Sequence, residues 1–535
     1  MEGDKLDVLI VGAGFSGLHL LQKLRKLNFN ANIYEAGKGI GGTWYWNRYT
    51  GARVDSDFPF YQFTQDDIWK DFKFTERFPA RAELIKYFNY VDEKLDLNRH
   101  IKFDARVTSA KYDGSEWLVE INNNKANVTR AKFIILCTGF AECRHTPSFK
   151  GLDTFKGVTV HTSLWPESGI DVAGKRVAVI GTGASGVQVI QEFAPIVDHL
   201  TVYQRTPNLA LPMQQSFISD QTKWKFPAAS DVQEIFNKTR TSFGGMGFDF
   251  IPTNGSDATP EEQEAVFEDL YRRGGFYFWV GNYQDIFVNP KTNDAAYQFW
   301  CKKARSRIND PVKRDILAPL VAPHPFGTKR PSLEQCYYEK YNQDNVDIIN
   351  VRQSPILEIT ENGVRTEKEG VIDVDVIVFA TGFDQSGTIL NIELRNERNE
   401  SIQDKWKNGV WTNIGISTAG FPNMFFTYGP HAPTAIANGP TCVEIQGDWI
   451  IELLDRMRKD NKTKIVATEE AEIKWKDTVN VLWNRSLFPL ADSWYQSANI
   501  PGKPREALNF AGGIPLYLSI LDECAKNNYK DFVLS

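Results

Sequence analysis

The chain has few of the residues that build disulfide frameworks or zinc sites. Its 535 residues include six cysteines, and none of them forms a CxxC pair or has the spacing of a metal finger. A disulfide scaffold and a structural zinc site therefore have little support, and no metal is expected. This cysteine usage fits a reducing compartment.

Long apolar runs and a signal sequence are also absent. The segment before Val8 is short and polar, so it leaves no room for a signal peptide with its own hydrophobic region. No stretch reaches the roughly 18 to 20 apolar residues that a membrane-spanning helix needs. We expect a protein that does not enter a membrane and lies in the cytoplasm.

The chain has no excess of positive charge. Lys and Arg number 61 against 67 for Asp and Glu, which gives a net charge of -6, and no basic stretch could follow a phosphate backbone. Nucleic acid is therefore not an expected partner, and nothing in the composition implies a protein partner. A hydrophobic share of 42% in a chain of this length instead indicates a large core divided among several domains.

The first feature with a chemical meaning is a glycine turn between a strand and a helix. An apolar run over 6–11 precedes Gly12-Ala-Gly14-Phe-Ser-Gly17, and leucines at helical spacing follow it. The next strand, about 31–34, ends at Glu35, 18 residues after Gly17. Such glycines permit a sharp turn, close approach to a pyrophosphate and tight helix packing, and the acid meets a ribose hydroxyl. We predict a nucleotide site at this turn.

The same arrangement returns in the second quarter of the chain. Gly181-Thr-Gly183-Ala-Ser185-Gly186 follows a strand at 176–180 and precedes a helix. Here Arg205, 19 residues after Gly186, stands in place of the acid. A guanidinium suits a 2′-phosphate, so this site is predicted to prefer NADP to NAD, and the first site to hold an adenosine without that phosphate. The alternative for Arg205 is a solvated charge at a strand end.

Two later apolar strands share one ending. Residues 135–140 and 378–383 both end in Thr-Gly-Phe. Each is expected to close one nucleotide fold, although either alone could be an ordinary buried strand with a glycine turn. Their pairing with two glycine motifs favours a duplicated architecture.

The region from about 211 to 326 lacks any strand–turn–helix unit. Its helical stretches include one well-marked start, where Thr259 and Glu262 form a capping box around Pro260. We therefore expect an inserted helical domain. Because Pro331 disfavours helical geometry at the residue before it, Arg330 is expected on an extended linker that can reach a cleft.

A more specific signal lies between the two glycine motifs. The segment Phe155-Lys-Gly157-Val-Thr-Val-His161-Thr-Ser-Leu-Trp165-Pro166 resembles the FxGxxxHxxxWP fingerprint of Baeyer-Villiger monooxygenases. The resemblance also covers 41–48, 51–55, 327–330 and 493–503, and so spans nearly the whole chain. It implies an α/β fold with two Rossmann-like domains, for FAD and NADP, and an inserted helical domain.

The expected domain limits follow from these motifs. Residues 1–145 and 385–535 would form the FAD-binding domain, and 150–210 with 333–384 the NADP-binding domain. Residues 211–332 would form the helical insert and its linker.

The resemblance also implies the activity. FAD, reduced by NADPH, would react with O2 to give a C4a-peroxyflavin, which attacks a ketone to form a tetrahedral (Criegee) adduct and then an ester or lactone. Arg330 matches the catalytic arginine of the family, and Asp55 matches the carboxylate that positions it. A guanidinium stays charged near neutral pH, so it can stabilise the peroxide anion and the adduct without donating a proton.

Further residues take their expected roles from the same resemblance. Lys329 would join Arg205 and Thr206 on the 2′-phosphate, Trp494 would cover the nicotinamide, and His161 would act through the hinge between domains. The rest of the expected cofactor-binding set is Gly42, Thr43, Trp44, Asp55, Ser185, Thr381 and Gly382.

The ketone pocket is the least defined part of the site. The spacing after Tyr428-Gly-Pro430 resembles the phenylacetone type of monooxygenase more than the cyclohexanone type. On this basis Thr434 and Ala435 are expected to line the pocket. The alternative for both is an ordinary loop.

Three other functions are alternatives to this interpretation. A flavin-containing monooxygenase that oxidises sulfides or amines has a similar fingerprint, but one that does not end in Trp-Pro. A disulfide reductase needs a redox cysteine pair after the first glycine motif, and no cysteine precedes Cys137. A non-catalytic flavoprotein that senses the NADP redox state has no positive support in the sequence.

Overall fold

The structure is a computed structural model that describes residues 4–219 and 229–535. Residues 1–3 and 220–228, which fall within the expected ranges 1–145 and 211–332, lie outside the described residues.

The largest sheet is built from the two ends of the chain. Its strands are β1 (Lys5–Val11), β2 (Ala31–Tyr34), β3 (Ile101–Lys102), β4 (Val107–Tyr112), β5 (Trp117–Ile121), β6 (Asn124–Leu136), β17 (Glu393–Arg395) and β18 (Met424–Phe426). They run in the order β17-β4-β5-β6-β1-β2-β3, with β18 beside β6. The parallel pairs β1–β2 and β1–β6 confirm the first Rossmann-like unit, and the register joins Ile10 to Ile33 and Ile135.

Helices α1 (Phe15–Lys26) and α14 (Gly439–Lys459) pack against each other beside this sheet. The apolar face of α1 accounts for this, because Leu18, Leu21 and Leu24 recur at helical spacing and are fully buried. A segment more than 400 residues later in the sequence thus covers the first helix.

The second sheet has five parallel strands. They are β7 (Val158–His161), β8 (Arg176–Ile180), β9 (His199–Gln204), β12 (Val346–Asn350) and β16 (Val376–Phe379), in the order β12-β9-β8-β16-β7. Helix α5 (Ala184–Phe193) follows β8 at the second glycine turn. An antiparallel meander of β13 (Ile356–Ile359), β14 (Gly363–Thr366) and β15 (Gly370–Asp373) leads into β16.

The region between Pro212 and Leu333 is helical, as the sequence predicts. It holds α6 (Ala229–Thr241), α7 (Pro260–Arg273), α8 (Tyr277–Val280), α9 (Pro290–Arg305) and α10 (Pro311–Leu317). Helix α7 begins with the expected capping box, in which the Thr259 side chain accepts from the Glu262 N–H and the Glu262 side chain accepts from the Thr259 N–H. The parallel pair β10 (Leu211–Pro212) and β11 (Leu333–Glu334) brings the start and the end of this region side by side.

The remaining helices and strands are distributed along the chain. They are α2 (Thr43–Trp46), α3 (Asp66–Trp69), α4 (Arg81–Leu95), α11 (Tyr337–Lys340), α12 (Gly387–Leu390), α13 (Ile402–Lys405), α15 (Glu469–Asn484), α16 (Gly513–Lys526), β19 (Ile465–Ala467) and β20 (Phe532–Leu534). Short 3-10 turns include η3 (Thr162–Leu164), η5 (Phe488–Leu490) and η6 (Trp494–Gln496).

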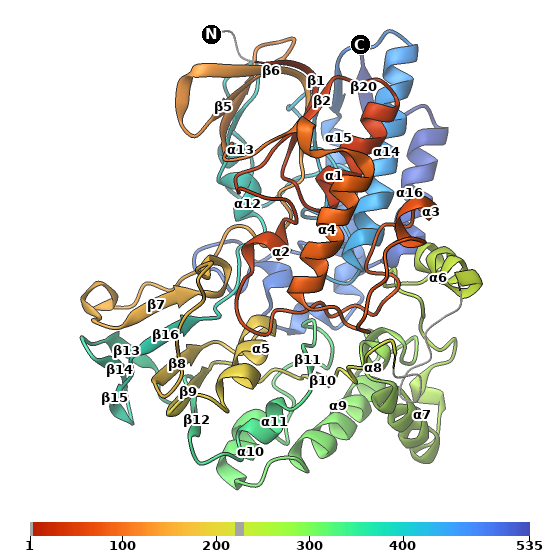
Figure 1. Cartoon of the computed structure of the whole chain (residues 1–535). Helices are drawn as coiled ribbons and strands as arrows, with labels where there is room; N and C mark the ends of the chain where they lie inside the picture. The colour runs from red at the N-terminus through yellow and green to blue at the C-terminus, as the bar shows by residue number, and fades with distance from the viewer. Residues whose placement is uncertain (1–3, 220–228) are drawn as a thin grey trace.

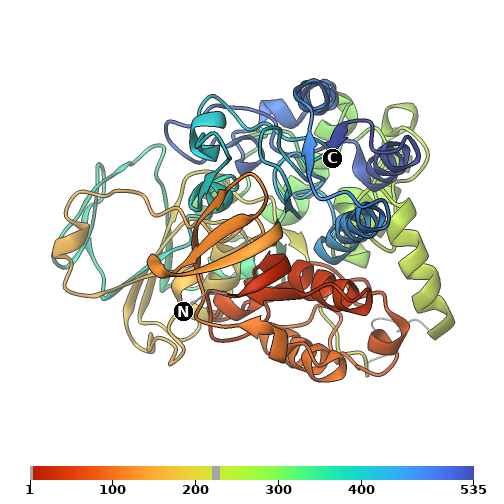
Figure 2. The ribbon, with the colours of Figure 1, turned by 90° about the horizontal axis from the view of Figure 1, so that it is seen from above.

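The three parts meet around one interior. In Figure 1 the large sheet with α1 and α14 lies at the top, the five-stranded sheet at the lower left and the helical region at the lower right. Seen from above, the meander β13–β15 projects to one side, away from the C-terminus (Figure 2). One continuous apolar cluster includes Val8 of the first sheet, Val177 of the second and Trp279 of the helical region.

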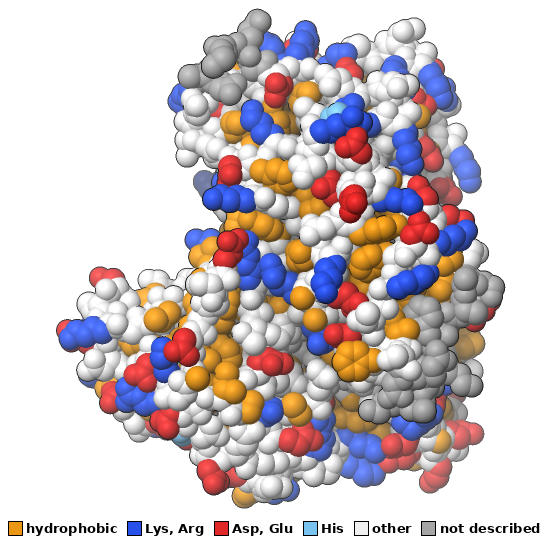
Figure 3. Space-filling view, viewed as in Figure 1, with side chains coloured by type: hydrophobic (Ala, Val, Ile, Leu, Met, Phe, Trp, Pro, Cys, Tyr) orange, Lys and Arg blue, Asp and Glu red, His pale blue; other side chains and the backbone are white. Residues whose placement is uncertain are grey.

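The surface carries mixed charges. On the face shown in Figure 3, Lys and Arg side chains alternate with Asp and Glu, without a continuous patch of one sign. Among the described residues, no helix has the length and hydropathy required to cross a bilayer.

Candidate active site

The two glycine turns have the tight geometry expected of nucleotide-binding loops. Gly12 and Gly181 have φ angles of +107° and +106°, which favour glycine. A Cβ atom on Gly17 or Gly186 would collide with the carbonyl oxygen of Gly12 or Gly181. The last glycine of each motif therefore lets the helix pack directly on the turn.

Both helices that follow these turns begin without a side-chain cap. Gly14 is the N-cap of α1 and Gly183 that of α5, and neither helix has an acidic residue in its first turn. The backbone N–H groups at these helix starts can therefore bind an anion, and the helix dipole favours one. These features fit the pyrophosphates of FAD and NADP.

Glu35 closes the first turn from the end of β2. It is 4% exposed, and its two carboxylate oxygens accept from the N–H groups of Ala13 (2.7 Å) and Gly37 (2.8 Å). Burial raises the pKa of Glu35, and the two N–H donors oppose that rise. The carboxylate thus holds the glycine turn in place, and its remaining lone pairs suit ribose hydroxyls.

Gly42 lies against the first glycine turn, as expected of a residue that binds the same nucleotide. Its φ is +53°, and a Cβ atom there would lie 2.9 Å from the Cα of Gly14. The next residues, Thr43 and Trp44, begin α2. The Trp44 indole N–H donates to the Tyr61 hydroxyl at 3.0 Å, which fixes the indole ring.

Three cations gather at the end of the second Rossmann-like unit. Lys329 and Arg205 are the expected pair, and Arg352 joins them from the loop after β12. Arg352 donates to the carbonyl of Arg205 (3.0 Å) and to the Thr206 hydroxyl (3.3 Å). Burial and the charges of Arg205 and Arg352 lower the pKa of Lys329 to about 8.

Burial and the charge of Arg352 likewise lower the pKa of Arg205. Among the described charges that act on Arg205 and Lys329 there is no carboxylate to offset this repulsion. A concentration of unneutralised positive charge at this place fits a dianionic 2′-phosphate.

Arg330 and Asp55 meet across 275 positions of sequence. The Nε and Nη2 atoms of Arg330 donate to the two oxygens of Asp55, both at 2.8 Å, in a bidentate pair. Burial alone would lower the pKa of Arg330, but its ion pair with Asp55 raises the pKa above the usual arginine value. The guanidinium therefore stays charged at every working pH.

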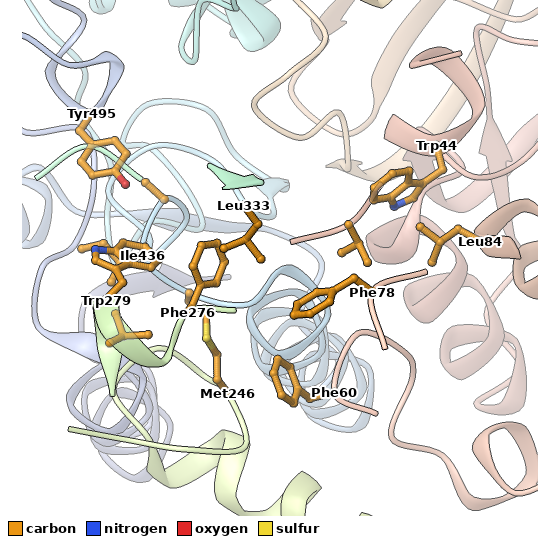
Figure 4. Packing of buried hydrophobic residues seen from close by; sticks show 14 of the residues in the cluster. Trp44, Phe60, Phe78, Leu84, Met246, Phe276, Trp279, Leu333, Ile436 and Tyr495 are labelled. Carbon is orange, nitrogen blue, oxygen red and sulfur yellow. The ribbon is translucent and has the colours of Figure 1, made fainter. Parts of the chain in front are cut away.

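The remaining sides of the Arg330 guanidinium face aromatic rings and a backbone oxygen. Its central carbon lies 4.6 Å from the ring centre of Phe276 and 5.4 Å from that of Trp279. Its Nη1 atom donates to the carbonyl of Ala435 at 3.2 Å. Figure 4 shows Phe276, Trp279, Ile436 and Tyr495 in the same buried cluster.

Thr434 and Ala435 belong to the loop whose backbone contacts Arg330. Both are 1% exposed. The Thr434 hydroxyl donates to the carbonyl of Gly429 at 2.7 Å and so stabilises its own loop, whereas Ala435 contacts Arg330 through its backbone.

The segment that carries Trp494 is folded into 3-10 turns. The Trp494 ring stacks on Phe140 with 5.1 Å between centroids and 5° between planes. Thr381 donates its hydroxyl to the carbonyl of His145, and Gly382 has a φ of +83°, so both residues shape the crossing between the two sheets.

The fingerprint lies at the edge of the second sheet. Val158–His161 forms β7 beside β16, and Trp165 packs on Phe193 of α5 at 6.0 Å. A Cβ atom on Gly157 would collide with the Asp375 carbonyl, next to Phe155. The structure thus places the fingerprint against the NADP-type unit. Its Pro166 lines a cavity together with Tyr45 and Arg81 of the first unit.

His161 is buried within the fingerprint. Its Nδ1 atom bonds the Ser163 side chain at 2.9 Å, and its ring meets Phe383, next to Gly382, edge-on at 5.8 Å. Burial and the charge of Arg144 lower the pKa of His161 to about 4. A neutral imidazole packed between β7 and the crossing segment fits the expected hinge role better than proton transfer.

Sequence reasoning missed two kinds of functional residue. Arg352 follows a strand without any glycine motif, and only the pairing of β12 with β9 brings it to Arg205. Three tyrosines, Tyr61, Tyr428 and Tyr495, also surround the Arg330–Asp55 pair, and burial raises the pKa of each of them. Two of these tyrosines lie next to motif residues, Tyr428 before Gly429 and Tyr495 after Trp494, and this position was the signal that could have identified them.

Metal chemistry has no candidate among residues 4–219 and 229–535. No group of three or more His, Cys, Asp or Glu side chains there could hold a metal ion. The six cysteines are free thiols.

Comparisons with known proteins agree with this geometry. The family described as flavin-binding monooxygenase-like matches residues 5–214. The chain is 46% identical to a cyclopentanone 1,2-monooxygenase from a Comamonas strain, over 99% of this chain and 96% of that protein. It is 35% identical to a Baeyer-Villiger monooxygenase of Pseudooceanicola batsensis, over 99% and 96%.

Among solved structures, a complex of OTEMO with FAD and NADP matches the whole of both chains. The TM-score is 0.93 at 33% sequence identity.

Proposed function

This chain belongs to the Baeyer-Villiger monooxygenase family, and on that premise we propose that Arg330 and Asp55 are its catalytic pair. The protein is an FAD- and NADPH-dependent monooxygenase that inserts one oxygen atom of O2 next to a ketone carbonyl and forms an ester or lactone. FAD belongs to the unit of β1 and α1, and NADPH to the unit of β8 and α5.

The observation that carries the proposal is the bidentate Arg330–Asp55 ion pair in an aromatic enclosure. When oxygen adds to a ketone, negative charge develops on the carbonyl oxygen, and a fixed cation stabilises that charge. At about 4 Å and an effective dielectric near 20, one such charge contributes roughly 4 kcal/mol, or close to three decades in rate. Asp55 holds the guanidinium in one orientation.

Bound FAD supplies the redox chemistry, because its reduced ring is the partner with which O2 reacts. The residues of this chain bind and enclose it. Gly12, Gly14, Gly17 and Gly42 shape its phosphate turn, and Glu35 faces its ribose. Trp44, fixed by Tyr61, and the rings near Arg330 exclude water that would otherwise divert the reaction.

The second site selects NADPH through its cations. Gly181, Gly183, Ser185 and Gly186 form the turn for the pyrophosphate. Arg205, Thr206, Lys329 and Arg352 bind the 2′-phosphate, which NADH lacks. Trp494 covers the nicotinamide from its position on Phe140. Thr381 and Gly382 shape the backbone that crosses between the two nucleotide sites.

The proposed division of the chain follows the same assignment. Residues 1–145 and 385–535 bind FAD, 150–210 and 333–384 bind NADP, and 211–332 form the helical insert with the linker that carries Arg330. The Phe155–Pro166 fingerprint joins the two nucleotide units, and His161 acts through that junction.

The substrate is a ketone whose carbonyl reaches Arg330 beside Thr434 and Ala435. The name of the relative with 46% identity makes cyclopentanone the first compound to assay. An aryl ketone and a linear ketone complete a panel that separates pocket shapes.

The test is Arg330→Ala in the FAD-loaded enzyme. NADPH should still reduce the flavin within about twofold of the normal rate, because Arg330 acts after reduction. Ester formation should fall by roughly three decades, as the lost charge stabilisation predicts. Stopped-flow absorbance measures the first step and product mass the second.

A matched control is Arg365→Ala, which removes an exposed arginine on β14 and should leave both steps unchanged. Retained ester formation in Arg330→Ala would reject the catalytic pair. Oxidation of sulfides or amines alone, without any ester from ketones, would assign the chain to heteroatom oxygenation.

A further inference from the structure

Asn509 is a buried amide close to the Arg330 site that no motif singles out. It is 0% exposed and lies between the segment of Trp494 and helix α16. Its Oδ1 accepts from the Ala435 N–H at 3.1 Å, and its Nδ2 donates to the Tyr495 carbonyl at 3.2 Å. The side-chain amides of Gln385 and Asn509 also pair with each other: Gln385 Nε2 donates to Asn509 Oδ1 and Asn509 Nδ2 donates to Gln385 Oε1, both at 3.4 Å.

The partner of Asn509 is the same residue that accepts from Arg330. Asn509 binds the N–H of Ala435, and Arg330 Nη1 binds its carbonyl. Two backbone bonds align the segments on either side, from His431 N–H to the Leu508 carbonyl (2.8 Å) and from Phe510 N–H to the Ala432 carbonyl (3.0 Å). Asn509 therefore lies where two chain segments are hydrogen-bonded to each other, and Ala435 alone separates its side chain from the Arg330 guanidinium.

We propose that Asn509 is a positioning residue for Arg330, an inference that rests on the catalytic role proposed for Arg330. Asp55 fixes two of the guanidinium donor atoms, and the Ala435 carbonyl fixes the third. Asn509 holds that carbonyl in place by anchoring the loop on the N–H side. Small displacements of a charged group cost rate steeply, because the benefit depends on its distance from the developing charge.

The same amide also connects this loop to the segment that carries Trp494. The amide of Asn509 carries its acceptor and its donor on two different atoms, so it bonds Ala435 and Tyr495 at the same time. Asn509 thus makes the position of Arg330 depend on the folded state of residues 493–497.

The experiment compares two buried asparagines. Asn423 is also 0% exposed and also ties backbone segments, with bonds to Lys132, Thr463 and Ile465 at the end of β6. Asn509→Leu and Asn423→Leu therefore remove similar buried bonds, but only one of them is linked to Arg330. Both are assayed as FAD-loaded enzymes.

For Asn509→Leu we expect flavin reduction within about twofold of normal, and about a tenfold lower ratio of ester to NADPH consumed, with hydrogen peroxide making up the difference. For Asn423→Leu the melting temperature should fall while that ratio stays normal. Equal ester-to-NADPH ratios in Asn509→Leu and the unmodified enzyme overturn the inference.

Should Asn509→Leu yield no FAD-loaded protein, Asn509→Asp replaces it. This side chain keeps an oxygen for the Ala435 N–H but has no donor for Tyr495 when ionised, so the ester-to-NADPH ratio should still fall. A normal ratio in this variant also overturns the inference.

Arg330→Ala in the same assay separates the two proposals. If it keeps ester formation, the proposed catalytic role itself is wrong. If it loses ester formation while the Asn509 variants keep it, only the positioning role is wrong.

Discussion

At the scale of single residues, the proposed 2′-phosphate site concentrates positive charge. Lys329 lies near Arg205 and Arg352, and both charges disfavour its protonated form. A bound phosphate would reverse that effect, because an anion favours the charged lysine. Lys329 is therefore most fully protonated when the phosphate is bound, and the affinity of the site for the phosphate depends on pH.

The resulting prediction concerns NADPH affinity. With the pKa of Lys329 at about 8, the side chain is charged below pH 8 and loses its proton above it. The dissociation constant for NADPH should therefore rise between pH 7.5 and 9, whereas that for NADH should stay nearly constant. Titration of protein fluorescence with each nucleotide measures both.

Arg352→Ala tests the residue that the motifs did not reveal. Loss of one phosphate contact should weaken NADPH binding about tenfold or more, because a hydrogen bond to a charged group contributes roughly 1.5–3 kcal/mol. Because one repelling charge is gone, the pKa of Lys329 should rise and the pH-dependent weakening should move to higher pH. Equal weakening of NADH binding, without a shift in the pH profile, would exclude Arg352 from the phosphate site.

At the scale of elements, the glycines of one turn have different roles, because one is needed for packing and another for contact with the ligand. The last glycine of each motif touches the turn itself, whereas the middle glycine of the second motif faces open space. Apart from its neighbours in the chain, no atom of the described residues lies within 4 Å of a Cβ built on Gly183, whereas a Cβ on Gly186 would collide with the carbonyl oxygen of Gly181. The same helix start thus contains one glycine needed for the fold and one needed for the nucleotide.

Gly186→Ala and Gly183→Ala should differ accordingly. Gly186→Ala should destabilise the protein by roughly 1–3 kcal/mol, because the helix must shift away from the turn. Gly183→Ala should leave the melting temperature unchanged and weaken NADPH binding, since its methyl group occupies the side open to the pyrophosphate. Thermal unfolding and NADPH titration of both variants decide this. Equal stability of the two would remove the distinction.

At the scale of the whole molecule, polar bonds between the two nucleotide units add to the apolar cluster that the units share. Gln188 of α5 accepts from the Tyr49 hydroxyl at 2.7 Å and donates to the Arg53 carbonyl at 2.9 Å. Arg48 also pairs with Glu167, just after the fingerprint, at 2.8 Å. These contacts hold the segment before Asp55 against the NADP unit, so they set the relative placement of the two cofactors.

Gln188→Leu removes both of its bonds. The expected cost is about 2 kcal/mol, at roughly 1 kcal/mol for each hydrogen bond, and it should appear as local opening instead of global unfolding. Hydrogen exchange should quicken in residues 45–53 and in α5, and NADPH should reduce the flavin more slowly. The exposed Asp198→Asn is the control on the same unit. Unchanged exchange in both segments would show that other contacts hold the units together.

The sequence by itself determined the local elements and the cofactor chemistry. The glycine turns, the strands around them and the Thr259 cap depend on neighbours a few residues apart, so their patterns are visible in the chain. The acid at 35 and the cation at 205 follow each motif at a fixed distance. The fingerprint around His161 and the motifs of Asp55 and Arg330 added the family and hence the reaction.

Only the tertiary structure decided which side chains meet. Arg352 reaches Arg205 through strand pairing, Ala435 presents a carbonyl to Arg330, and Asn509 holds Ala435 from 74 residues away. No periodicity encodes such contacts, because each depends on how separate layers pack in space. The physical reason is that electrostatic interactions and hydrogen bonds depend on the distance between atoms in the folded protein, and not on the number of residues between them in the chain.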